Sequence, residues 1–331
     1  MRSVSIAKVA EHAGVSVATV SRVLNGNLVV KEATRARVAA SIHATGYRVN
    51  HLARSLRTDE SRLLLAMVPD IGNPFYAQIV QGIDGAMQQR GYSLLLCETG
   101  GDAGRERKYF DLLESRRADG AICLDADTVQ QALHEQTMKF PWVACCEFDP
   151  QAAVPYVGID NRAAAREATT CLIEKGHTRI AFLNSDTRFM YARERLHGYI
   201  EATEQAGIAV DPDYCIALET LDFSAGKKAV TRLLALPRRP TAVFAVADTL
   251  AIGVLRGLHD ARLRVPEDMA VMGFDDIALA EQTCPALSTV RQPMRTLGEQ
   301  AAYLLLKQLD DRATPAAGVV LPHQLVLRES A

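Results

Sequence analysis

The sequence predicts a small all-α head at the N-terminus, followed by a larger α/β body made of two doubly wound subdomains with parallel sheets. Two short helical patterns and their caps occupy the first 46 residues. Beyond residue 60, apolar strand-like runs alternate with amphipathic segments, a pattern typical of βαβ units. A chain of 331 residues also exceeds one ordinary domain and suits a small module plus a body of two halves.

The head contains two short helical patterns joined by a tight turn. Ser5 is placed to cap the first, in which Ile6, Val9 and Ala10 share one face, and Gly14 ends it. Ser16 is placed to cap the second, whose inward positions are Val20, Val23 and Leu24 and whose outer positions are Val17, Ala18, Ser21, Arg22 and Asn25. A third helix is expected from about Glu32 to Thr45. This arrangement is typical of a helix-turn-helix, whose second helix enters the DNA major groove.

In the body, short apolar runs predict strands and amphipathic segments predict helices. The strands expected in the first half are Leu63–Val68, Tyr92–Leu96, Gly120–Leu124, Trp142–Cys145 and Tyr156–Ile159. Those expected in the second half are Ile180–Leu183, Cys215–Leu218, Ala242–Ala245 and Ala270–Met272. The expected helices include Phe75–Gln89, Arg105–Glu114, Arg162–Glu174, Leu196–Gln205, Ser224–Leu234 and Thr249–Asp260. Because ligands of open parallel sheets bind beyond the carboxyl ends of the strands, we expect a binding cleft between the two halves.

The charge of the chain is unevenly distributed. Residues 1–60 carry nine Lys/Arg and four Asp/Glu, a net charge of +5, so that the rest of the chain carries −7 of the total of −2. A basic head on an acidic body is the layout expected when a small module binds phosphates. The alternative is a solvated surface with chance clustering.

The sequence lacks the signatures of several other classes of protein. It has no Gly-x-Gly-x-x-Gly, Walker-type, Gly-x-Ser-x-Gly or His-Glu-x-x-His motif, which argues against an α/β enzyme. The seven cysteines are scattered without Cys-x-x-Cys spacing, so we expect buried free thiols and neither a metal nor a cofactor. No run approaches the roughly 18 apolar residues that span a membrane, and no secretory signal is recognisable at the N-terminus. We therefore expect a cytoplasmic protein without membrane contact.

The detailed motifs resemble the LacI/GalR family along essentially the whole chain. The head reads Val4-Ser5-Ile6-Ala7-Lys8-Val9-Ala10, then Ala13-Gly14-Val15-Ser16-Val17-Ala18-Thr19-Val20-Ser21-Arg22-Val23-Leu24-Asn25. In the body, similar pieces are Asn73-Pro74-Phe75-Tyr76, Gly158-Ile159-Asp160-Asn161, Arg195-Leu196-x-Gly198-Tyr199, Asp248-x-x-Ala251-x-Gly253 and Gly273-Phe274-Asp275-Asp276. The run Val68-Pro69-Asp70-Ile71 and the general texture are most similar to the cytidine repressor branch.

This resemblance implies a repressor with a body like that of the periplasmic binding proteins. The expected parts are a head at 1–46, a hinge at 47–60 and a body at 61–331. The body would divide into an N-subdomain of about 61–160 plus about 292–321, and a C-subdomain of about 161–291 plus about 322–331. The partners implied are pseudo-palindromic operator DNA, a sugar or nucleoside effector and a second copy of the chain in a homodimer. A periplasmic sugar-binding protein is a rival interpretation, against which the intact head argues.

The resemblance also implies residues that bind DNA. Val17, Ala18 and Arg22 would meet base edges, and the residues that would steady the head on DNA are Ser5, Ser16, Thr19, Ser21 and Asn25. Arginine has a planar fork suited to guanine, although a plain phosphate clamp is the alternative for Arg22. In the hinge, the implied contacts are Asn50, Leu52, Ala53 and Leu56, with Leu56 as a wedge between base pairs. Without the family, Leu52 and Leu56 form an ordinary apolar stripe.

For the effector, the strongest candidates are Arg195 and Asp275, which would face each other across the cleft and bind vicinal hydroxyls from opposite sides. The further candidates are Asp70, Phe75, Tyr76, Asp160, Phe189, Tyr191, Leu221, Phe223 and Asp248. Some have an ordinary structural alternative: a core position for Phe75 and Tyr76, a surface charge for Arg195 and a helix cap for the aspartates after strands, Asp248 in particular. Leu221 stands where relatives carry a stacking aromatic, which modestly favours a sugar.

Overall fold

The computed structural model describes residues 4–24, 30–47, 60–124, 140–149, 154–311 and 317–331. The chain forms two compact units, Met1–Ser61 and Arg62–Ala331, which correspond to the head and the body. The predicted contacts Asn25, Asn50, Leu52, Ala53 and Leu56 lie outside the described residues. Their predicted roles therefore stay predictions.

The head is a bundle of three helices around a small apolar core. They are α1 (Ile6–Ala13), α2 (Val17–Leu24) and α3 (Glu32–Thr45). Gly14 ends α1 in the left-handed conformation, with φ of 59°, and Gly46 ends α3 in the same way. The core consists of Val9, Ala10, Ala13, Val20 and Val38. The predicted helices and their inward faces are confirmed.

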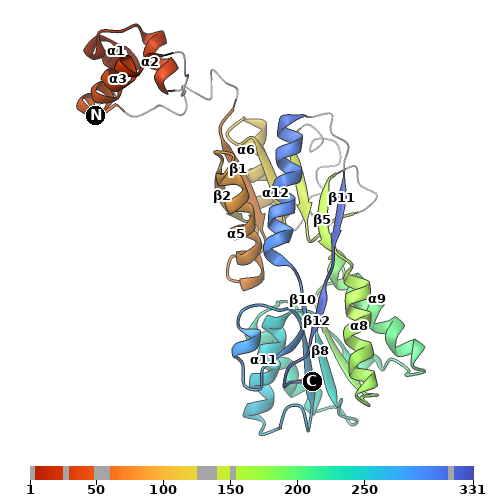
Figure 1. Cartoon of the computed structure of the whole chain (residues 1–331). Coiled ribbons are helices and arrows are strands. Elements are labelled where there is room, and N and C mark those ends of the chain that lie inside the picture. The colour runs from red at the N-terminus through yellow and green to blue at the C-terminus, as the bar shows by residue number, and fades with distance from the viewer. Residues whose placement is uncertain (1–3, 25–29, 48–59, 125–139, 150–153, 312–316) are drawn as a thin grey trace. The chain divides into compact units, whose positions relative to one another are not determined.

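The first half of the body is a parallel six-stranded sheet (Figure 1). Its strands are β1 (Leu63–Val68), β2 (Ser93–Glu98), β3 (Gly120–Cys123), β4 (Trp142–Cys145), β5 (Tyr156–Ile159) and β11 (Gly318–Leu321), in the order β11-β5-β4-β3-β1-β2. The expected start of β2 at Tyr92 is wrong, because the N–H of Tyr92 bonds to the carbonyl of Met87 and ends the preceding helix.

The second half repeats this plan with strands β6 (Ile180–Asn184), β7 (Cys215–Ala217), β8 (Ala242–Ala245), β9 (Ala270–Asp275), β10 (Ser288–Arg291) and β12 (Gln324–Val326), in the order β12-β10-β9-β8-β6-β7. Only the pair β10–β12 among these is antiparallel. Strand β9 runs to Asp275, beyond the expected Met272, because β10 pairs with it as far as Asp275. The expected strands did not include β10, β11 or β12.

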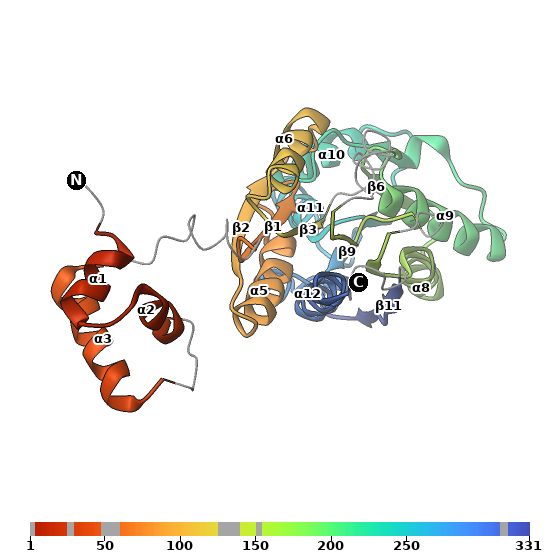
Figure 2. The ribbon, with the colours of Figure 1, turned by 90° about the horizontal axis from the view of Figure 1, so that it is seen from above.

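Helices cover the first sheet on both faces. They are α5 (Pro74–Gln88), α6 (Ala103–Glu114) and α12 (Met294–Asp310). Alternate residues of β1 show the two faces: Leu64 belongs to the core cluster that contains α5 and α12, whereas Leu65 belongs to the cluster that contains α6. Figure 2 shows α6 on the opposite side of the strands from α5 and α12. A side chain at Gly82 or Gly298 would collide with backbone of the partner helix, so these glycines permit the close packing of α5 on α12.

Two pairs of helices flank the second sheet. They are α8 (Asn161–Glu174) with α9 (Met190–Gln205), and α10 (Phe223–Leu234) with α11 (Asp248–Asp260). Two short 3₁₀ turns lie at Pro212–Tyr214 and Ala280–Gln282. Helix α9 begins at Met190, six residues before the expected Leu196. The first turn of α9 is held by a side chain from the other half of the body, as described below.

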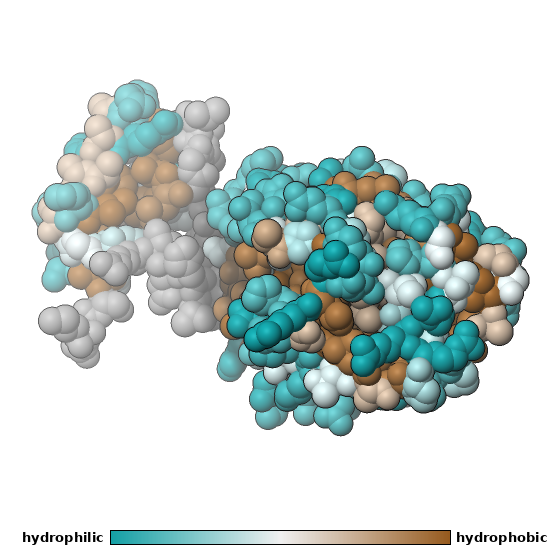
Figure 3. Space-filling model, turned by 90° about the horizontal axis from the view of Figure 1, so that it is seen from below, coloured by the Kyte–Doolittle hydropathy of each residue, from teal (hydrophilic) through white to brown (hydrophobic). Residues whose placement is uncertain are grey.

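The chain crosses between the two halves after β5, after β10 and between β11 and β12 (Figure 1). These crossings place Asn161 and Gln292 between the sheets. All seven cysteines are free thiols, as expected, but the expectation of burial holds only for Cys97, Cys123 and Cys145. Half-buried positions are taken by Cys146, Cys171 and Cys215, and Cys284 is exposed in the loop between a 3₁₀ turn and β10. None of the described helices is long and apolar enough to cross a membrane. Hydrophilic residues are spread over the face of the body shown in Figure 3.

Candidate functional site

Helix α2 presents small and basic side chains to solvent. Val17 is 45% exposed, and Ala18 and Arg22 are also exposed, whereas Val20 is fully buried. Ser21 is half-buried. One face of α2 therefore packs on the head, and the opposite face is accessible to a macromolecule.

Serine and threonine side chains fix the starts of the first two helices. The Ser5 hydroxyl accepts the backbone N–H of Lys8 at 3.4 Å, at the start of α1. The Ser16 hydroxyl accepts the N–H of Thr19 at 3.1 Å, and its oxygen lies 2.9 Å from the hydroxyl of Thr19. These contacts orient the first turn of α2, which carries Val17 and Ala18.

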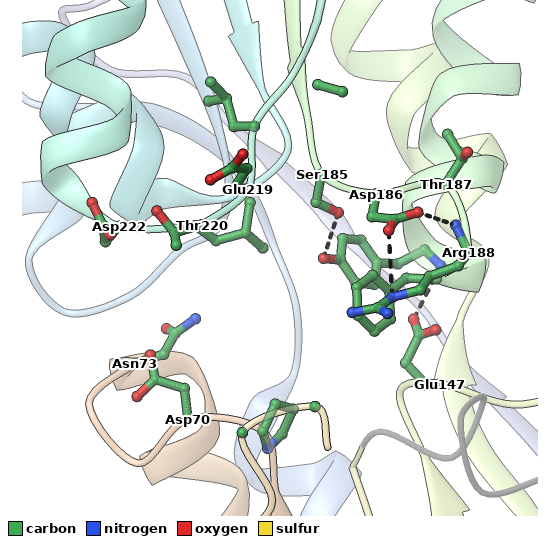
Figure 4. A pocket seen from close by; sticks show the side chains of 18 of the residues that line it. Asp70, Asn73, Glu147, Ser185, Asp186, Thr187, Arg188, Glu219, Thr220 and Asp222 are labelled. Atoms are coloured by element: carbon green, nitrogen blue, oxygen red, sulfur yellow. Dashed lines mark hydrogen bonds and ion pairs between the residues drawn. The ribbon is translucent and has the colours of Figure 1, made fainter. Parts of the chain in front are cut away.

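A cavity of about 740 Å³ lies in the body where the two halves face each other. The first half lines it with Pro69, Asp70, Asn73, Tyr76, Gly100, Gly101 and Glu147. The second half lines it with Ser185, Asp186, Thr187, Arg188, Phe189, Tyr191 and the segment 217–222. Figure 4 shows labelled residues from both halves around this space, which we call the large cavity.

A second cavity of about 40 Å³, the small cavity, shares Asn73, Tyr76, Glu147, Tyr191 and Leu221 with the large one and therefore adjoins it. Its other lining residues are Phe75, Leu124, Cys146, Ile159, Asn161, Arg195, Val246, Ala247, Asp275 and Gln292. The residues around it are more buried than those of the large cavity, and they include the arginine and the aspartate that the sequence pointed to first.

Arg195 is held in one orientation by contacts on every side. Its guanidinium is 6% exposed, its Nε donates to Oδ1 of Asn161 at 2.9 Å, and its Nη1 donates to the carbonyl of Val246. Its carbon Cζ lies 3.5 Å from the centre of the Phe274 ring and 5.1 Å from that of Tyr191. Burial lowers the pKa of Arg195, and the neighbouring charge of Asp275 acts against this. The side chain is thus a preorganised donor at the small cavity.

Asp275 ends β9 beside this arginine. Its Oδ1 accepts the Nε2 of Gln292 at 2.7 Å and lies 4.0 Å from Nη1 of Arg195. Burial raises the pKa of Asp275 to about 7, while Arg195 and the Gln292 bond act in the opposite direction. Asp275 and Asp276 have φ of 120° and 60°, in the left-handed region that side chains disfavour. Such strain is typical of residues whose position matters to a site.

Glu147 links the two halves at the cavity wall. It follows β4 in the first half, and its carboxylate accepts the backbone N–H groups of Met190 at 2.8 Å and Tyr191 at 3.0 Å in the second half. The side chain is 4% exposed although it lines both cavities. Glu147 therefore caps α9, whose own N-cap residue, Phe189, makes no capping bond.

Comparison with known proteins identifies the family. Residues 5–50 match the model described as bacterial regulatory proteins, lacI family, and residues 169–331 match a periplasmic binding protein-like domain. The transcriptional repressor CytR of Escherichia coli K12 is 37% identical over 97% of this chain and 94% of its own. The chain belongs to the LacI family.

Other members support the same assignment. The ribose operon repressor of E. coli K12 is 38% identical to this LacI-family chain over 91% of it and 92% of the repressor. The structure of the lac repressor dimer bound to operator and the anti-inducer ONPF superimposes with a TM-score of 0.87 at 26% identity, covering 99% of both chains. The structure of the regulator CelR in complex with cellobiose superimposes with a TM-score of 0.74 at 33% identity, covering 99% of this chain and 100% of that one. All three are transcriptional repressors or regulators.

In this LacI-family body, the cavities collect most of the predicted effector residues. Asp70 and Phe189 line the large cavity, Phe75, Arg195 and Asp275 line the small one, and Tyr76, Tyr191 and Leu221 line both. Phe75 is only 7% exposed and also belongs to the core, so the two interpretations of this residue are both satisfied. The rings of Phe75 and Tyr76 meet edge to face, with centroids 5.1 Å apart.

The geometry of the Arg195–Asp275 pair differs from the expectation. The two side chains do not face each other across the cleft, because α9 and β9 both belong to the second half. They lie together on one wall. What faces them from the other half are Phe75, Tyr76 and Glu147.

Asp248 lies outside both cavities and does not cap α11. It is the first residue of that helix and is fully buried. One carboxylate oxygen accepts the hydroxyl of Thr289 at 2.6 Å and the other accepts the N–H of Ile277 at 2.9 Å. The carboxylate of Asp248 fits at this position because residue 273 is a glycine. A Cβ atom on residue 273 would lie 2.2 Å from Oδ1 of Asp248. Asp248 therefore joins α11 to β10 and to the residues after β9.

Asp160 and Phe223 are also absent from the cavity walls. Asp160 is exposed and caps α8 through the N–H of Ala163 at 2.8 Å. The next residue, Asn161, reaches the small cavity instead. Phe223 is 42% exposed at the start of α10 and lines neither cavity.

Sequence reasoning missed several wall residues, among them Glu147, Asn161, Ser185, Arg188 and Gln292. Asn161 and Ser185 follow strands, a signal that was available. Glu147 also stands shortly after a predicted strand, but its role depends on a helix that begins 43 residues further along the chain. Gln292 gave no such signal, because the strand before it was not predicted.

Proposed function

We propose that the chain is a homodimeric transcriptional repressor whose affinity for operator DNA is controlled by a sugar or nucleoside bound in the large cavity and reaching the small cavity that adjoins it. The observation that carries this proposal is the combination, in one LacI-family chain, of an exposed α2 face and a walled cavity of about 740 Å³. Cavities of roughly 300–1,000 Å³ are the usual size for small-molecule sites.

On the DNA side, Val17, Ala18 and Arg22 are the proposed base-reading residues. Their exposure on one face of α2 supports this role, since an α-helix fits the major groove. Those proposed to contact phosphates or steady the helix are Ser5, Ser16, Thr19, Ser21 and Asn25. In the hinge, Asn50, Leu52, Ala53 and Leu56 keep the minor-groove role that the family resemblance implies.

On the effector side, Arg195 and Asp275 are proposed to bind adjacent hydroxyls from the same wall. Both are held rigidly by their neighbours, so little ordering is needed when a ligand arrives. Tyr76, Phe75 and Leu221 would cover the ligand from apolar sides, and Asp70, Phe189 and Tyr191 would border the large cavity. The named relatives, a ribose operon repressor and a cellobiose complex of CelR, make a sugar or nucleoside the natural class.

A second copy of the chain is the proposed protein partner. Leu95 and Leu96 are 41% and 46% exposed on the edge strand β2, and exposed apolar residues on a sheet edge mark a place where another chain packs. Two heads are also needed to read two half-sites of an operator. Such a dimer would act by binding and not by catalysis, in the cytoplasm where operator DNA lies.

The test is operator binding by the full chain, measured by fluorescence anisotropy at fixed salt with a panel of sugars and nucleosides. Arg22→Ala should weaken binding to the specific operator by about 1–3 kcal/mol, the usual value of a bidentate base contact. Arg37→Ala, at an exposed position of α3, is the matched control and should change it less. Leu56→Ala should weaken binding without altering effector affinity. A panel in which no compound changes operator affinity would contradict the proposed effector class.

A further inference from the structure

Three helices of the body begin at the large cavity. Their N-cap residues, Asn73 of α5, Phe189 of α9 and Asp222 of α10, all line it. The unpaired N–H groups of a helix start carry partial positive charge and commonly bind phosphate or other anions. Whether these starts are open or filled therefore bears on the charge of the ligand.

Two of the three starts are filled by their own N-cap side chains. Oδ1 of Asn73 accepts the N–H of Phe75 at 3.1 Å. Oδ1 of Asp222 accepts the N–H of Ala225 at 2.8 Å. Asp222 also places a negative charge at the start of α10, where an anionic ligand would otherwise be favoured.

The third start, that of α9, is filled from the opposite half of the body by Glu147. Both carboxylate oxygens are used, one by the N–H of Met190 and one by the N–H of Tyr191. Figure 4 shows Glu147 directed at this end of α9, beside Arg188 and Ser185. With only 4% of its surface exposed, the carboxylate is little screened by water. It occupies the position that a phosphate group would take at an open helix start.

The arginines near the ligand space are engaged as well. Arg195 donates to Asn161 and to the carbonyl of Val246, and it lies 4.0 Å from Asp275. Arg188 lies 3.5 Å from the carboxylate of Asp186 and stacks on the Phe189 ring at 4.8 Å. The described lining of the large cavity holds five carboxylates against this single arginine; they are Asp70, Glu147, Asp186, Glu219 and Asp222. Such a lining repels an anion.

We propose that Glu147 determines the charge class of the effector: its carboxylate fills the α9 start and excludes phosphate esters, so that the chain responds to an uncharged sugar or nucleoside. This inference rests on the proposed function and adds a residue and a selection rule to it. An uncharged ligand can form hydrogen bonds with the cavity walls, and it is not repelled by the carboxylates that line them. A phosphate ester of the same compound brings a second anion to a helix start that is already occupied.

The experiment uses the full chain and matched pairs of compounds: ribose and ribose 5-phosphate, a pyrimidine nucleoside and its 5′-monophosphate, and a purine nucleoside and its 5′-monophosphate. Affinity is measured by calorimetric titration and by the change in operator binding. For the pair that contains the effector, we expect the phosphate ester to bind the parent at least about a hundredfold more weakly than the uncharged compound.

The variant Glu147→Gln removes the charge with little change of shape and leaves an N–H of α9 without its acceptor. It should narrow the gap in affinity between the phosphate ester and the uncharged compound by about tenfold or more. Glu204→Gln is the matched control, since Glu204 is exposed near the other end of α9 and lines neither cavity. It should leave the gap nearly unchanged.

The possible results separate the two proposals. A phosphate ester that binds the parent as tightly as its uncharged partner overturns the selection rule and leaves the repressor function intact; this comparison needs no variant. An unchanged gap in folded Glu147→Gln overturns the assignment to Glu147. If neither form of any pair binds the parent, the proposed effector class itself is contradicted.

Discussion

The two halves of the body share one plan, but they contribute differently to the cavities. Each sheet has the same succession of six strands, so β4 in the first half occupies the position of β9 in the second. A residue with positive φ stands at the end of each strand: Cys146, at 72°, directly follows β4, and Asp275, at 120°, is the last residue of β9. Both strand ends deliver a carboxyl group to the cavities, Glu147 from the first half and Asp275 from the second. Asp275 lies beside a guanidinium, whereas Glu147 binds a helix start. A repeated fold therefore sets where side chains emerge, while the residue types decide the chemistry.

The buried charge pair belongs to the second half alone, and its loss should have the largest effect. Arg195→Ala or Asp275→Ala should weaken effector binding by about 2–4 kcal/mol, following the size of charged hydrogen bonds and the penalty of an unmet buried partner. Calorimetric titration measures this loss. Arg256→Ala is the control, because its side chain is 68% exposed and it lines neither cavity. Unchanged effector affinity in the Arg195 and Asp275 variants would show that the site lies elsewhere.

Operator binding in the absence of effector should remain nearly unchanged in these variants, because the DNA-reading surface belongs to a separate compact unit. Loss of operator binding without effector would instead indicate that the pair holds the fold together.

The raised pKa of Asp275, which belongs to the second half, predicts that the free energy of unfolding depends on pH. The folded protein keeps a proton on Asp275 up to about pH 7, whereas an unfolded aspartate releases it near 3.8. Between these values the folded state binds more protons, so stability falls as pH rises. From pH 5 to pH 7 the loss should reach about 2 kcal/mol, somewhat less than 1.36 kcal/mol for each pH unit because Asp275 is already partly deprotonated as the pH approaches its pKa.

Urea unfolding of the parent and of Asp275→Asn over this pH range isolates the effect. The neighbours Arg195, Asp248 and Gln292 remain in both proteins, so the difference between the two curves reports the titration of Asp275 together with its effect on the pKa of Asp248. Parallel curves would contradict the prediction.

The buried junction around Asp248 should affect stability and not the ligand. Thr289→Val removes the hydroxyl that donates to Asp248 at 2.6 Å and leaves a buried carboxyl oxygen unsatisfied. We expect a loss of about 1–3 kcal/mol in unfolding free energy, measured by urea titration, with effector affinity within error of the parent. A changed effector affinity at full stability would place Asp248 in the site after all.

The smallest expected effect compares two neighbouring apolar residues in the second half. Leu221 lines both cavities, and Leu221→Ala should weaken effector binding by about 1–2 kcal/mol through lost apolar contact. Phe223→Ala, two residues further on, should leave it unchanged because Phe223 lies outside the cavities. Equal losses of effector affinity in the two variants would show that residues 221–223 are arranged differently when the effector is bound.

What the sequence determined by itself is the local structure and the family. Helix caps such as Ser5 and Ser16 act within three residues, and the apolar period of α2 follows from its own spacing, so the head could be predicted closely. Leu63–Val68 and Trp142–Cys145 were recognisable because strands buried on both faces are continuous apolar runs.

The tertiary structure alone decided which polar residues meet at the cavities. Asp160, Asp248 and Asp275 all follow strands, and nothing local separates the helix cap from the buried junction and the cavity wall. The role of each buried aspartate depends on a hydrogen-bond partner that is distant in sequence, Thr289 for Asp248 and Gln292 for Asp275. Glu147 shows the same limit, because its role exists only where α9 of the other half begins. Long-range packing creates these contacts, and no spacing in the sequence encodes them.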